Sequence, residues 1–544
     1  MRPHLLPGAG PARALLCALL VLAAPPRLPA QGPAQPHHLE ASETMRAIHL
    51  LQRATYGIRP GDVEEVLRIG RAAWLEHQLH PERIDDRRLE SRLARFPAAT
   101  MPATELMRRY AGRPAAPASQ TGAADSLRRG ANPQQVASPA RLALELVNAR
   151  LQRAVYSERQ LEEVMTDFWY NHFNVFYGKG IDRWLVAAYE REAIRPHVFG
   201  KFEDLLIATA THPAMLFYLD NWMSSAPPPG DGDGRSRPRA GRRRGINENY
   251  ARELLELHTL GVDGGYTQQD VIEVARAFTG WTIKRPRSGA QADEDTTSIA
   301  FVFRPAMHDR GEKIVLGHRL PAGRAIEDGL DVLRILAHHP STARHIATRL
   351  VQRFVADEPP QELVDEIANV FLRTGGDLRE VTRALFTAEA FYDPSHHRSK
   401  VKTPFEFVAS ALRATGADIE ESRGIVQALR SMGGLPYSEP APTGYPVDSR
   451  EWVNAGALVN RMNFALALAA GRIDGVRLDP EVRRAASDPG SLRELVGRLV
   501  PGAPTDRLEA TILTDLGRDD DAGSGRGGAR VLGLILGSPE FQRH

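Results

Sequence analysis

The sequence predicts a mainly α-helical protein, a multi-helix array of packed helical hairpins with one small β-hairpin near 301–316. Two observations support this fold class. Apolar residues recur at helical spacing through most of the 544 residues. Hydrophobic residues make up 42% of the chain, which is enough to bury a large core. Stretches that lack the helical spacing are rich in Gly, Pro and Ser, and we expect these to be long disordered loops.

The first thirty residues have the layout of a secretory signal peptide. Arg2 and Arg13 precede the apolar run 14–24, which is too short to cross a membrane, and small residues follow it up to Ala30. Cleavage after Ala30 would change the formal charge from +2 to −1 and remove Cys17, the single cysteine. We therefore expect an exported protein, periplasmic or extracellular, without disulfides or thiolate metal ligands.

After a flexible segment, 31–42, one helical region is expected over 43–541, with a sub-boundary near 282–324. Its predicted helices follow the apolar spacing, and the two clearest, 247–260 and 267–279, are separated by Gly261 and a turn. Thr267 and Asp270 form a capping signal for the second of these. The other helices are expected at 43–56, 60–79, 158–176, 183–195, 202–210, 400–415, 423–432, 452–470 and 531–541, with a further helix that begins at 139 and several within 325–392.

Four flexible insertions interrupt the helical region. Each is poor in apolar residues and rich in Gly, Pro, Ser or charge; they are 112–138, 224–245, 285–298 and 518–528. Six arginines in 224–245 are more typical of a solvated loop than of a binding surface. The strands of the small hairpin are expected at 301–303 and 313–316, on either side of His308 and Asp309.

Charge and hydropathy exclude two kinds of partner. The 69 basic residues nearly balance the 67 acidic ones, so no dedicated surface for nucleic acid is expected. Beyond the leader, no apolar stretch is long enough to span a membrane.

Helix 247–260 carries the first group of candidate site residues. A helical projection places five polar residues on one arc, Glu248, Asn249, Arg252, Glu253 and Glu256, and His258 among leucines on the other. A hydrolase would use Glu253 or Glu256 as general base, His258 or His172 as acid or metal ligand, and Arg252 to stabilise an anion, with Asn171 and Asn249 positioning the substrate. Alternatively, the arc consists of surface ion pairs and His258 is a core residue.

The aromatic helix 165–176 carries the second group. Asp167, Asn171 and Asn174 form a polar line along it, and His172 projects on another side. Among so many rings, the line indicates a buried hydrogen-bond network. The remaining candidate binding residues are Asn247, His308, Asp309, Tyr445 and Trp452.

No standard catalytic signature occurs in the chain. A divalent metal could be held by oxygen and imidazole groups from Asp167, His172, Glu253, Glu256, His258 or His308. Because the chain has 18 histidines, chance alone provides such candidates, and the metal content stays open.

Several segments resemble the bacterial family catalogued as domain of unknown function 1800, over about 47–541. They lie at 50–57 (LLQRATYG), 165–176 (MTDFWYNHFNVF), 247–281, 308–317 (HDRGEKIVLG), 400–417 and 442–468 (beginning PTGYPVDSREW). The resemblance implies an exported, mainly helical protein, often encoded beside an exported protein related to sulfatases and alkaline phosphatases. It implies no known reaction and no catalytic residues.

Three functions remain open. The first is a cell-envelope or extracellular protein that binds a partner protein or polymer, with exposed rings at Tyr437, Tyr445 and Trp452 in the loop 435–452 available for stacking. The second is a metal-assisted or acid/base hydrolase with its site between helices 165–176 and 247–260. In the third, the polar residues of both helices form a structural network that fixes how the helices pack.

Overall fold

The computed structural model describes residues 36–110, 138–226, 245–284, 299–516 and 525–544. By its internal contacts the chain divides into Met1–Ser42 and Glu43–His544, and the features below belong to the second unit. The expected signal peptide 1–30, the insertion 285–298 and most of the other insertions lie outside the described residues. None of the described helices is long and apolar enough to cross a membrane.

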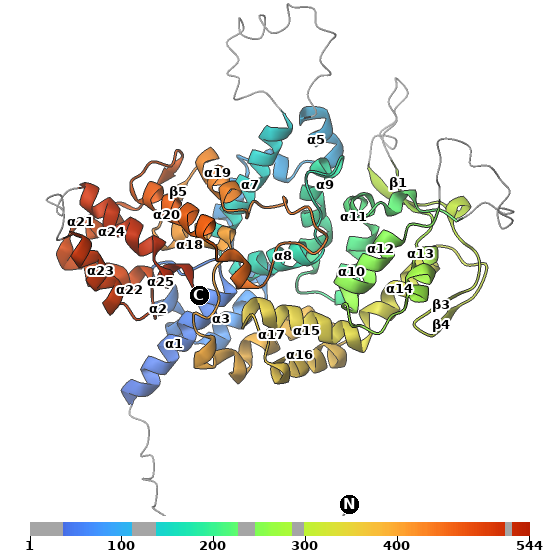
Figure 1. The fold of residues 1–544 in the computed structure, drawn as a ribbon, viewed down its shortest axis with the longest axis horizontal. Coiled ribbons are helices and arrows are strands. Elements are labelled where there is room, and N and C mark those ends of the chain that lie inside the picture. The colour runs from blue at the N-terminus through green and yellow to red at the C-terminus, as the bar shows by residue number, and fades with distance from the viewer. Residues whose placement is uncertain (1–35, 111–137, 227–244, 285–298, 517–524) are drawn as a thin grey trace, which may run out of the picture. The chain divides into compact units, whose positions relative to one another are not determined.

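Helices dominate the described residues, as the sequence predicts (Figure 1). In the first part of the chain they are α1 (Pro36–Ala54), α2 (Asp62–Ile69), α3 (Arg71–Gln78), α4 (Arg87–Leu93), α5 (Ala103–Tyr110), α7 (Pro139–Tyr156), α8 (Gln160–His172), α9 (Asp182–Tyr189), α10 (Phe202–Thr211), α11 (Pro213–Tyr218), α12 (Glu248–Glu253) and α13 (Gln268–Ala277). The first helix begins at Pro36, inside the segment that we expected to be flexible.

Twelve further helices follow in the second half of the described chain. They are α14 (Glu327–Ala337), α15 (Pro340–Phe354), α16 (Gln361–Thr374), α17 (Leu378–Thr387), α18 (Pro404–Ala414), α19 (Arg423–Ser431), α20 (Ala455–Ala469), α21 (Pro480–Ser487), α22 (Leu492–Leu499), α23 (Asp506–Leu516), α24 (Gly525–Gly537) and α25 (Pro539–Gln542). The start of α24 falls inside the expected insertion 518–528.

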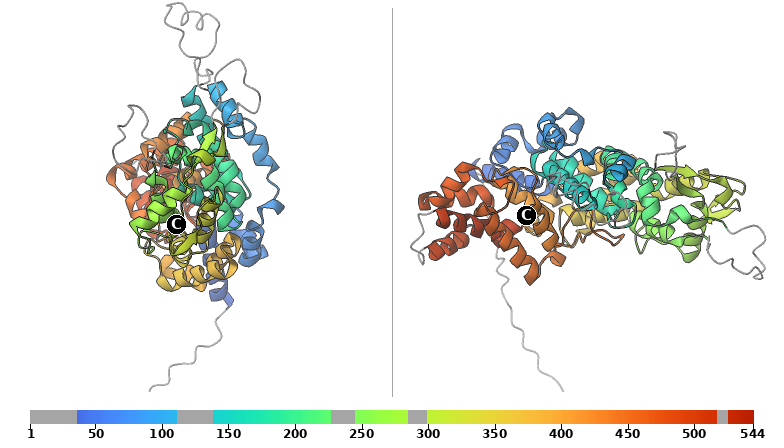
Figure 2. Two further views of the ribbon diagram at one scale, coloured as in Figure 1. Left: turned by 90° about the vertical axis from the view of Figure 1, so that its right-hand side faces the viewer. Right: turned by 90° about the horizontal axis from the view of Figure 1, so that it is seen from above.

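Neighbouring helices pack as hairpins and small groups. Helix α15 packs on α16 and α16 on α17, and these three lie together in yellow in Figure 1. Helix α24 packs against α20 and α21, within the orange and red group at one end of the right-hand view of Figure 2. The apolar faces of all these helices join in one core cluster.

The predicted β-hairpin is wrong in its pairing. Strand β2 (Ala300–Phe303) pairs with β1 (Trp281–Lys284), and β3 (Lys313–Val315) pairs with β4 (His318–Leu320). The second hairpin turns at Leu316 and Gly317, whose φ angles of 48° and 79° fit a two-residue type I′ turn. A third two-stranded sheet joins β5 (Asp418–Ile419) to β6 (Val476–Arg477).

Two expected helices are interrupted. Gly70, with φ 88° and ψ 142°, divides 60–79 into α2 and α3. The clear helix 247–260 is α-helical only to Glu253 and continues as a π-helix over Leu254–Thr259. A π-helix has more residues per turn than an α-helix, so a projection at 100° per residue misplaces the side chains after Glu253.

Candidate functional site

The polar line of α8 holds the loop 435–452 in place. The Asn171 side chain donates to the carbonyl oxygen of Tyr445 at 2.9 Å and accepts from its N–H at 2.7 Å. Asn174, just beyond the end of the helix, donates to the carbonyl oxygens of Glu439 and Ala441 at 2.9 and 2.8 Å. This line is therefore the hydrogen-bond network that the aromatic surroundings indicate.

The aromatic rings of this loop point into the protein, so the expectation of exposed rings is wrong. Tyr437 and Trp452 are buried, and Tyr445 is half-buried. Each polar end has a partner: the Tyr437 hydroxyl donates to Glu190 at 2.7 Å, the Tyr445 hydroxyl to the Leu435 carbonyl at 2.7 Å, and the Trp452 indole N–H to the Pro446 carbonyl at 3.1 Å. The loop is thus one wall of a packed site.

Behind the loop lies a cavity of about 80 Å³, which we call the loop cavity. Its walls come from α7, α8, α15, α18 and the loop itself. They include Arg150, Asp167, Tyr170, Asn171, Asn174, Arg353, Lys400, Glu406, Tyr437, Tyr445 and Trp452. Pro446, which is exposed, also lines it, so the cavity extends to the surface.

Arg150 is the central charge of one wall. Its guanidinium contacts Glu190 at 2.9 Å and also pairs with Asp167. Its Cζ atom lies 5.3 and 5.0 Å from the ring centroids of Tyr170 and Tyr437. Burial alone would raise the pKa of Glu190, but Arg150 and Arg195 lower it to about 2. In this wall the buried guanidinium of Arg150 is therefore paired with two carboxylates and lies over two aromatic rings.

Two more ion pairs involve residues that line the loop cavity. Arg353 pairs with Glu406, both buried, and Lys400 pairs with Asp357. Burial lowers the pKa of Lys400 to about 8, against the effect of the Asp357 carboxylate. Asp357 also accepts from the Ser449 N–H at 2.9 Å, which attaches the far end of the loop to this pair.

Gly444 shows how closely the loop approaches α8. Its φ is +70°, and a Cβ atom there would lie 2.3 Å from the Asn171 carbonyl oxygen. We expect Gly444→Ala to lower the free energy of unfolding by about 2–4 kcal/mol, from backbone strain and overpacking together. Urea unfolding measures this. Gly433→Ala is the control, since φ there is +78° but nothing lies within 4 Å of the added atom; equal losses in both variants would contradict the close approach.

The acidic arc of α12 lies away from the loop cavity. Arg252 pairs with Glu248 at 3.4 Å and contacts Gln268 at 3.1 Å, both part-exposed, and the Tyr266 hydroxyl donates to Glu256 at 3.4 Å. Burial, and then the neighbouring carboxylate of Glu256, raises the pKa of Glu253. None of the residues that line the loop cavity belongs to 247–260.

Asn247 and Asn249 have local structural contacts. Asn247 caps α12 by accepting from the Asn249 N–H at 2.9 Å. Both amides donate to the Leu219 carbonyl oxygen, at 3.1 and 3.4 Å. They fix the start of the helix to α11.

His172 and His258 do meet, in the core. Nε2 of His172 donates to the His258 carbonyl oxygen at 3.1 Å, and the two ring centroids are 6.3 Å apart. Burial lowers the pKa of His172 well below its usual value and that of His258 to about 3. The structure thus brings the two histidines together as neutral core residues and leaves Arg252, Glu253 and Glu256 outside this contact.

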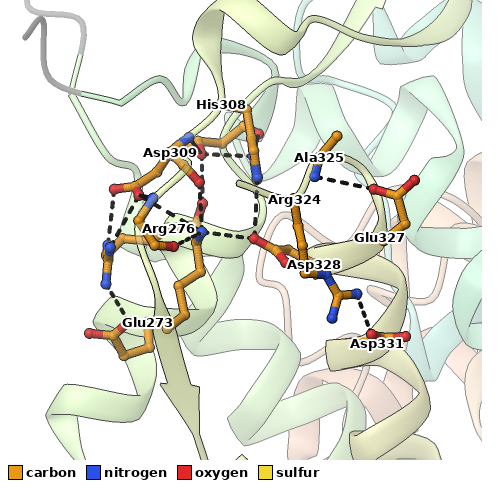
Figure 3. A network of polar contacts seen from close by, with 12 residues as sticks. Glu273, Arg276, His308, Asp309, Arg324, Ala325, Glu327, Asp328 and Asp331 are labelled. Carbon is orange, nitrogen blue, oxygen red and sulfur yellow. Dashed lines mark hydrogen bonds and ion pairs between the residues drawn. The ribbon is translucent and has the colours of Figure 1, made fainter. Parts of the chain in front are cut away.

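His308 and Asp309 belong to a separate network around Asp328 (Figure 3). The Asp328 carboxylate, 1% exposed, contacts Lys313 Nζ at 2.8 Å, Arg324 Nε at 3.0 Å and His308 Nε2 at 3.3 Å. His308 Nδ1 donates to the Thr279 carbonyl at 2.8 Å. Asp309 takes two hydrogen bonds from Arg276, at 2.9 and 3.1 Å. These contacts join β3 and α14 to α13.

Lys313 should be essential to this network. It is fully buried and also donates to the carbonyl oxygens of Asp309 and Gly311, at 2.6 and 2.9 Å. Lys313→Met leaves Asp328 buried with less compensation, so we expect a loss of about 3–5 kcal/mol in unfolding free energy, measured in urea. Arg319→Met, which removes an exposed pair with Glu312, should cost less than about 1 kcal/mol. A loss as small for Lys313 would contradict the buried pair.

The candidate metal ligands are not gathered at one point. Within the described ranges, no group of three or more His, Asp or Glu side chains is arranged to hold a metal ion. Asp167 lines the loop cavity, His172 and His258 are in the core, and His308 belongs to the Asp328 network.

Sequence reasoning missed the buried cations of the site. Arg150 and Arg353 lie on helices whose other buried residues are mostly apolar. A charged residue on the apolar face of a predicted helix was the available signal, because such a residue needs a buried partner. Their partners Glu190 and Glu406 are 40 and 53 residues away in sequence, so the pairs themselves could not be read from spacing.

Comparison with known proteins identifies a family and nothing narrower. No curated protein and no solved structure matches the chain. The pattern of one family, described as "Protein of unknown function (DUF1800)", matches residues 49–543, nearly the whole described region. Its segments 165–176, 400–417 and 442–468 supply much of the loop cavity. The chain belongs to the DUF1800 family of proteins of unknown function.

Proposed function

We propose that this protein is exported and acts in the cell envelope or outside the cell as a binding protein, with one saccharide unit of a polymer held in the loop cavity. The observation that carries the proposal is the composition of the cavity walls. The Arg150 guanidinium, paired with Asp167, lies over the rings of Tyr170 and Tyr437, and the Tyr445 ring lines the same cavity. Ring faces stack on the apolar side of a sugar, and charged groups form strong hydrogen bonds to its hydroxyls.

The size and accessibility of the cavity also support a single unit as ligand. A volume of about 80 Å³ is far below the roughly 300–1,000 Å³ of pockets that enclose drug-sized ligands, so the cavity has room only for a small group at the end or side of a chain. Asp167 keeps a third of its side chain exposed, so a ligand hydroxyl can reach it.

Binding can be tested with the secreted chain on an array of bacterial polysaccharide fragments, followed by calorimetry with the best ligand. Tyr445→Ala removes a half-buried ring of the cavity and should weaken binding by about tenfold, through lost stacking. Tyr266→Ala is the matched control, because that half-buried tyrosine lies outside the cavity, on Glu256. Equal affinity of the two variants, or capture of a partner protein with no saccharide bound, would overturn the proposal.

Export rests on the layout of residues 1–30 and is tested separately. Expression of the full chain with a C-terminal tag, fractionation and N-terminal sequencing should yield a periplasmic or extracellular product that starts at Gln31. A cytoplasmic product that keeps Met1 would contradict export, whatever the loop cavity binds.

The hydrolase hypothesis has weaker support. Its proposed bases, Glu253 and Glu256, do not line the loop cavity, and its proposed acids, His172 and His258, are buried in the core with their pKa values lowered by burial. A general acid must be protonated near the working pH and within reach of substrate. Neither histidine meets both conditions.

A further inference from the structure

A second, smaller cavity lies on the other side of Glu406 from the loop cavity. Its volume is about 30 Å³, and Glu406 and His544 line both cavities. The walls come from the end of α1, from α18, from 499–501 and from the last residues of the chain. We call it the basic cavity, because Lys402 and Arg398 lie in its wall.

Lys402 is buried there without a carboxylate partner among the described residues. Its side chain is largely inaccessible, with 9% of the residue exposed. Nζ donates to the Phe541 carbonyl oxygen at 2.7 Å and lies 4.1 Å from the centroid of the Phe541 ring. Both contacts are weaker than an ion pair at this depth, so most of the ammonium charge stays uncompensated.

Arg398 faces the same cavity with a free donor. Its Nη2 atom is buried and has no hydrogen-bond acceptor in the described part of the chain. Nη1 reaches only the Pro501 carbonyl, at 3.4 Å. The backbone of Arg398 has φ +55°, a costly conformation for a residue with a side chain. The guanidinium therefore lies at the cavity wall with one donor unused.

The carboxylates nearby do not neutralise these two cations. Glu406 is already paired with Arg353, and its other oxygen accepts from the Thr403 N–H at 2.7 Å. Glu540 also lines the cavity, and its charge acts on Arg398 by raising the pKa of that guanidinium against the effect of burial, but no ion pair joins the two side chains within the described residues. Two further cations add to the excess: Arg53 and Arg461 are buried, and each has two nitrogen positions without an acceptor among the described residues.

Such an excess of buried positive charge is unfavourable in an empty protein and favourable around an anion. We propose that the basic cavity binds a small oxyanion, a carboxylate or a tetrahedral phosphate-type group, through Lys402 Nζ and the Arg398 guanidinium. A guanidinium and an ammonium lining one small cavity are the donors that such anions prefer. The site is separate from the loop cavity and does not depend on the function proposed for it.

The electrostatics of the two cations agree with this assignment. Burial lowers the pKa of Lys402 to about 7, and Arg398 and Arg461 lower it further against the effect of Glu406. Burial also lowers the pKa of Arg398 to about 10. A bound anion would favour the charged form of both groups and so stabilise the folded chain.

The test measures the melting temperature and the heat of binding of the full mature chain in sodium sulfate, phosphate and acetate, each against sodium chloride at equal ionic strength. We expect saturable binding of at least one oxyanion, with a higher melting temperature. Lys402→Met and Arg398→Gln should each weaken it by about tenfold or more, because each removes a charge-assisted hydrogen bond. Acetate binding alone would assign a carboxylate, and sulfate or phosphate binding a tetrahedral group.

Arg493→Gln is the control, since this arginine is 82% exposed and lies outside both cavities. In chloride alone, Lys402→Met should melt no lower than the unmodified chain, because it removes an uncompensated charge. A loss of anion binding by Lys402→Met can then be attributed to the missing ammonium group and not to unfolding. No saturable binding of any of the three anions, or equal binding by the unmodified chain and both cavity variants, would overturn the proposal.

Discussion

Arg150→Met should lower the free energy of unfolding by about 3–5 kcal/mol, which is a large share of the stability of an ordinary domain. The loss comes from the groups left behind. Glu190 stays buried with only Arg195 and the Tyr437 hydroxyl as partners, and Asp167 loses its guanidinium. The rings of Tyr170 and Tyr437 also lose the cation that lies 5.3 and 5.0 Å from their centroids. Urea unfolding followed by circular dichroism gives the free energy.

A matched control shows how much of the loss in unfolding free energy comes from the burial of the ion pair and how much from losing any ion pair. Arg344 pairs with Asp365 on the surface, with about half of each side chain exposed. Arg344→Met should change the free energy of unfolding by less than about 1 kcal/mol. A double variant, Arg150→Met with Glu190→Gln, should recover part of the loss, because the buried carboxylate is then neutral. Equal effects of Arg150→Met and Arg344→Met would show that the cavity wall does not depend on this charge.

Local sequence signals predicted where individual helices and strands lie better than they predicted which elements pack or pair with one another. The capping signal at Thr267 and Asp270 is a complete capping box, and Gly261 ends its helix with φ +86°. Both depend only on nearby residues. Strands β1 and β2 pair with each other although the segment 285–298 lies between them in sequence. No local signal therefore indicated that β1 is the partner of β2. The π-helix at Leu254–Thr259 has no composition of its own, so it could not be predicted, although Glu256 still lies on the part-exposed side and His258 in the core.

In the candidate site, too, the local pattern could be predicted and the distant partners could not. The line Asp167, Asn171 and Asn174 could be recognised because a polar row on an aromatic helix needs partners. That these partners are Arg150 and the loop 435–452 could not be read from the chain, since Asn171 and Tyr445 are 274 residues apart. Lys402 and Arg398 gave no signal at all, because a basic residue beside a helix start is usually solvated. Only the packing shows that Lys402 is buried and that the part-exposed Arg398 has a buried Nη2 atom beside the same cavity.

The folded protein should be strongly destabilised between about pH 6.5 and pH 5, because several histidines are buried in neutral form. Burial lowers the pKa of His49 to about 2, of His212 and His258 to about 3, and of His345 to about 4. The pKa values of His172 and His544 are also lowered by burial. In the unfolded chain these rings take up protons below about pH 6.5, whereas in the folded chain they do not.

The sign follows from the excess of protons bound by the unfolded state. Each buried histidine makes the stability fall by about 1.4 kcal/mol per pH unit as the pH drops below about 6.5, until its folded pKa is reached. The paired carboxylates lose their contribution to stability only at a lower pH than the histidines do. Glu190, with its pKa lowered to about 2, loses its contribution only below the unfolded value of about 4.3. Acid unfolding should therefore begin with the histidines.

Unfolding free energies measured in urea at half-unit steps from pH 7.5 to pH 5 test this, because their slope counts the protons taken up on unfolding. His258→Gln should reduce the slope by about one proton, whatever its effect on the absolute stability. His77→Gln, which removes an exposed ring, is the control variant. A stability that stays level from pH 7 to pH 5 would mean that these rings gain protons without unfolding, and that the core around His172 and His258 admits water.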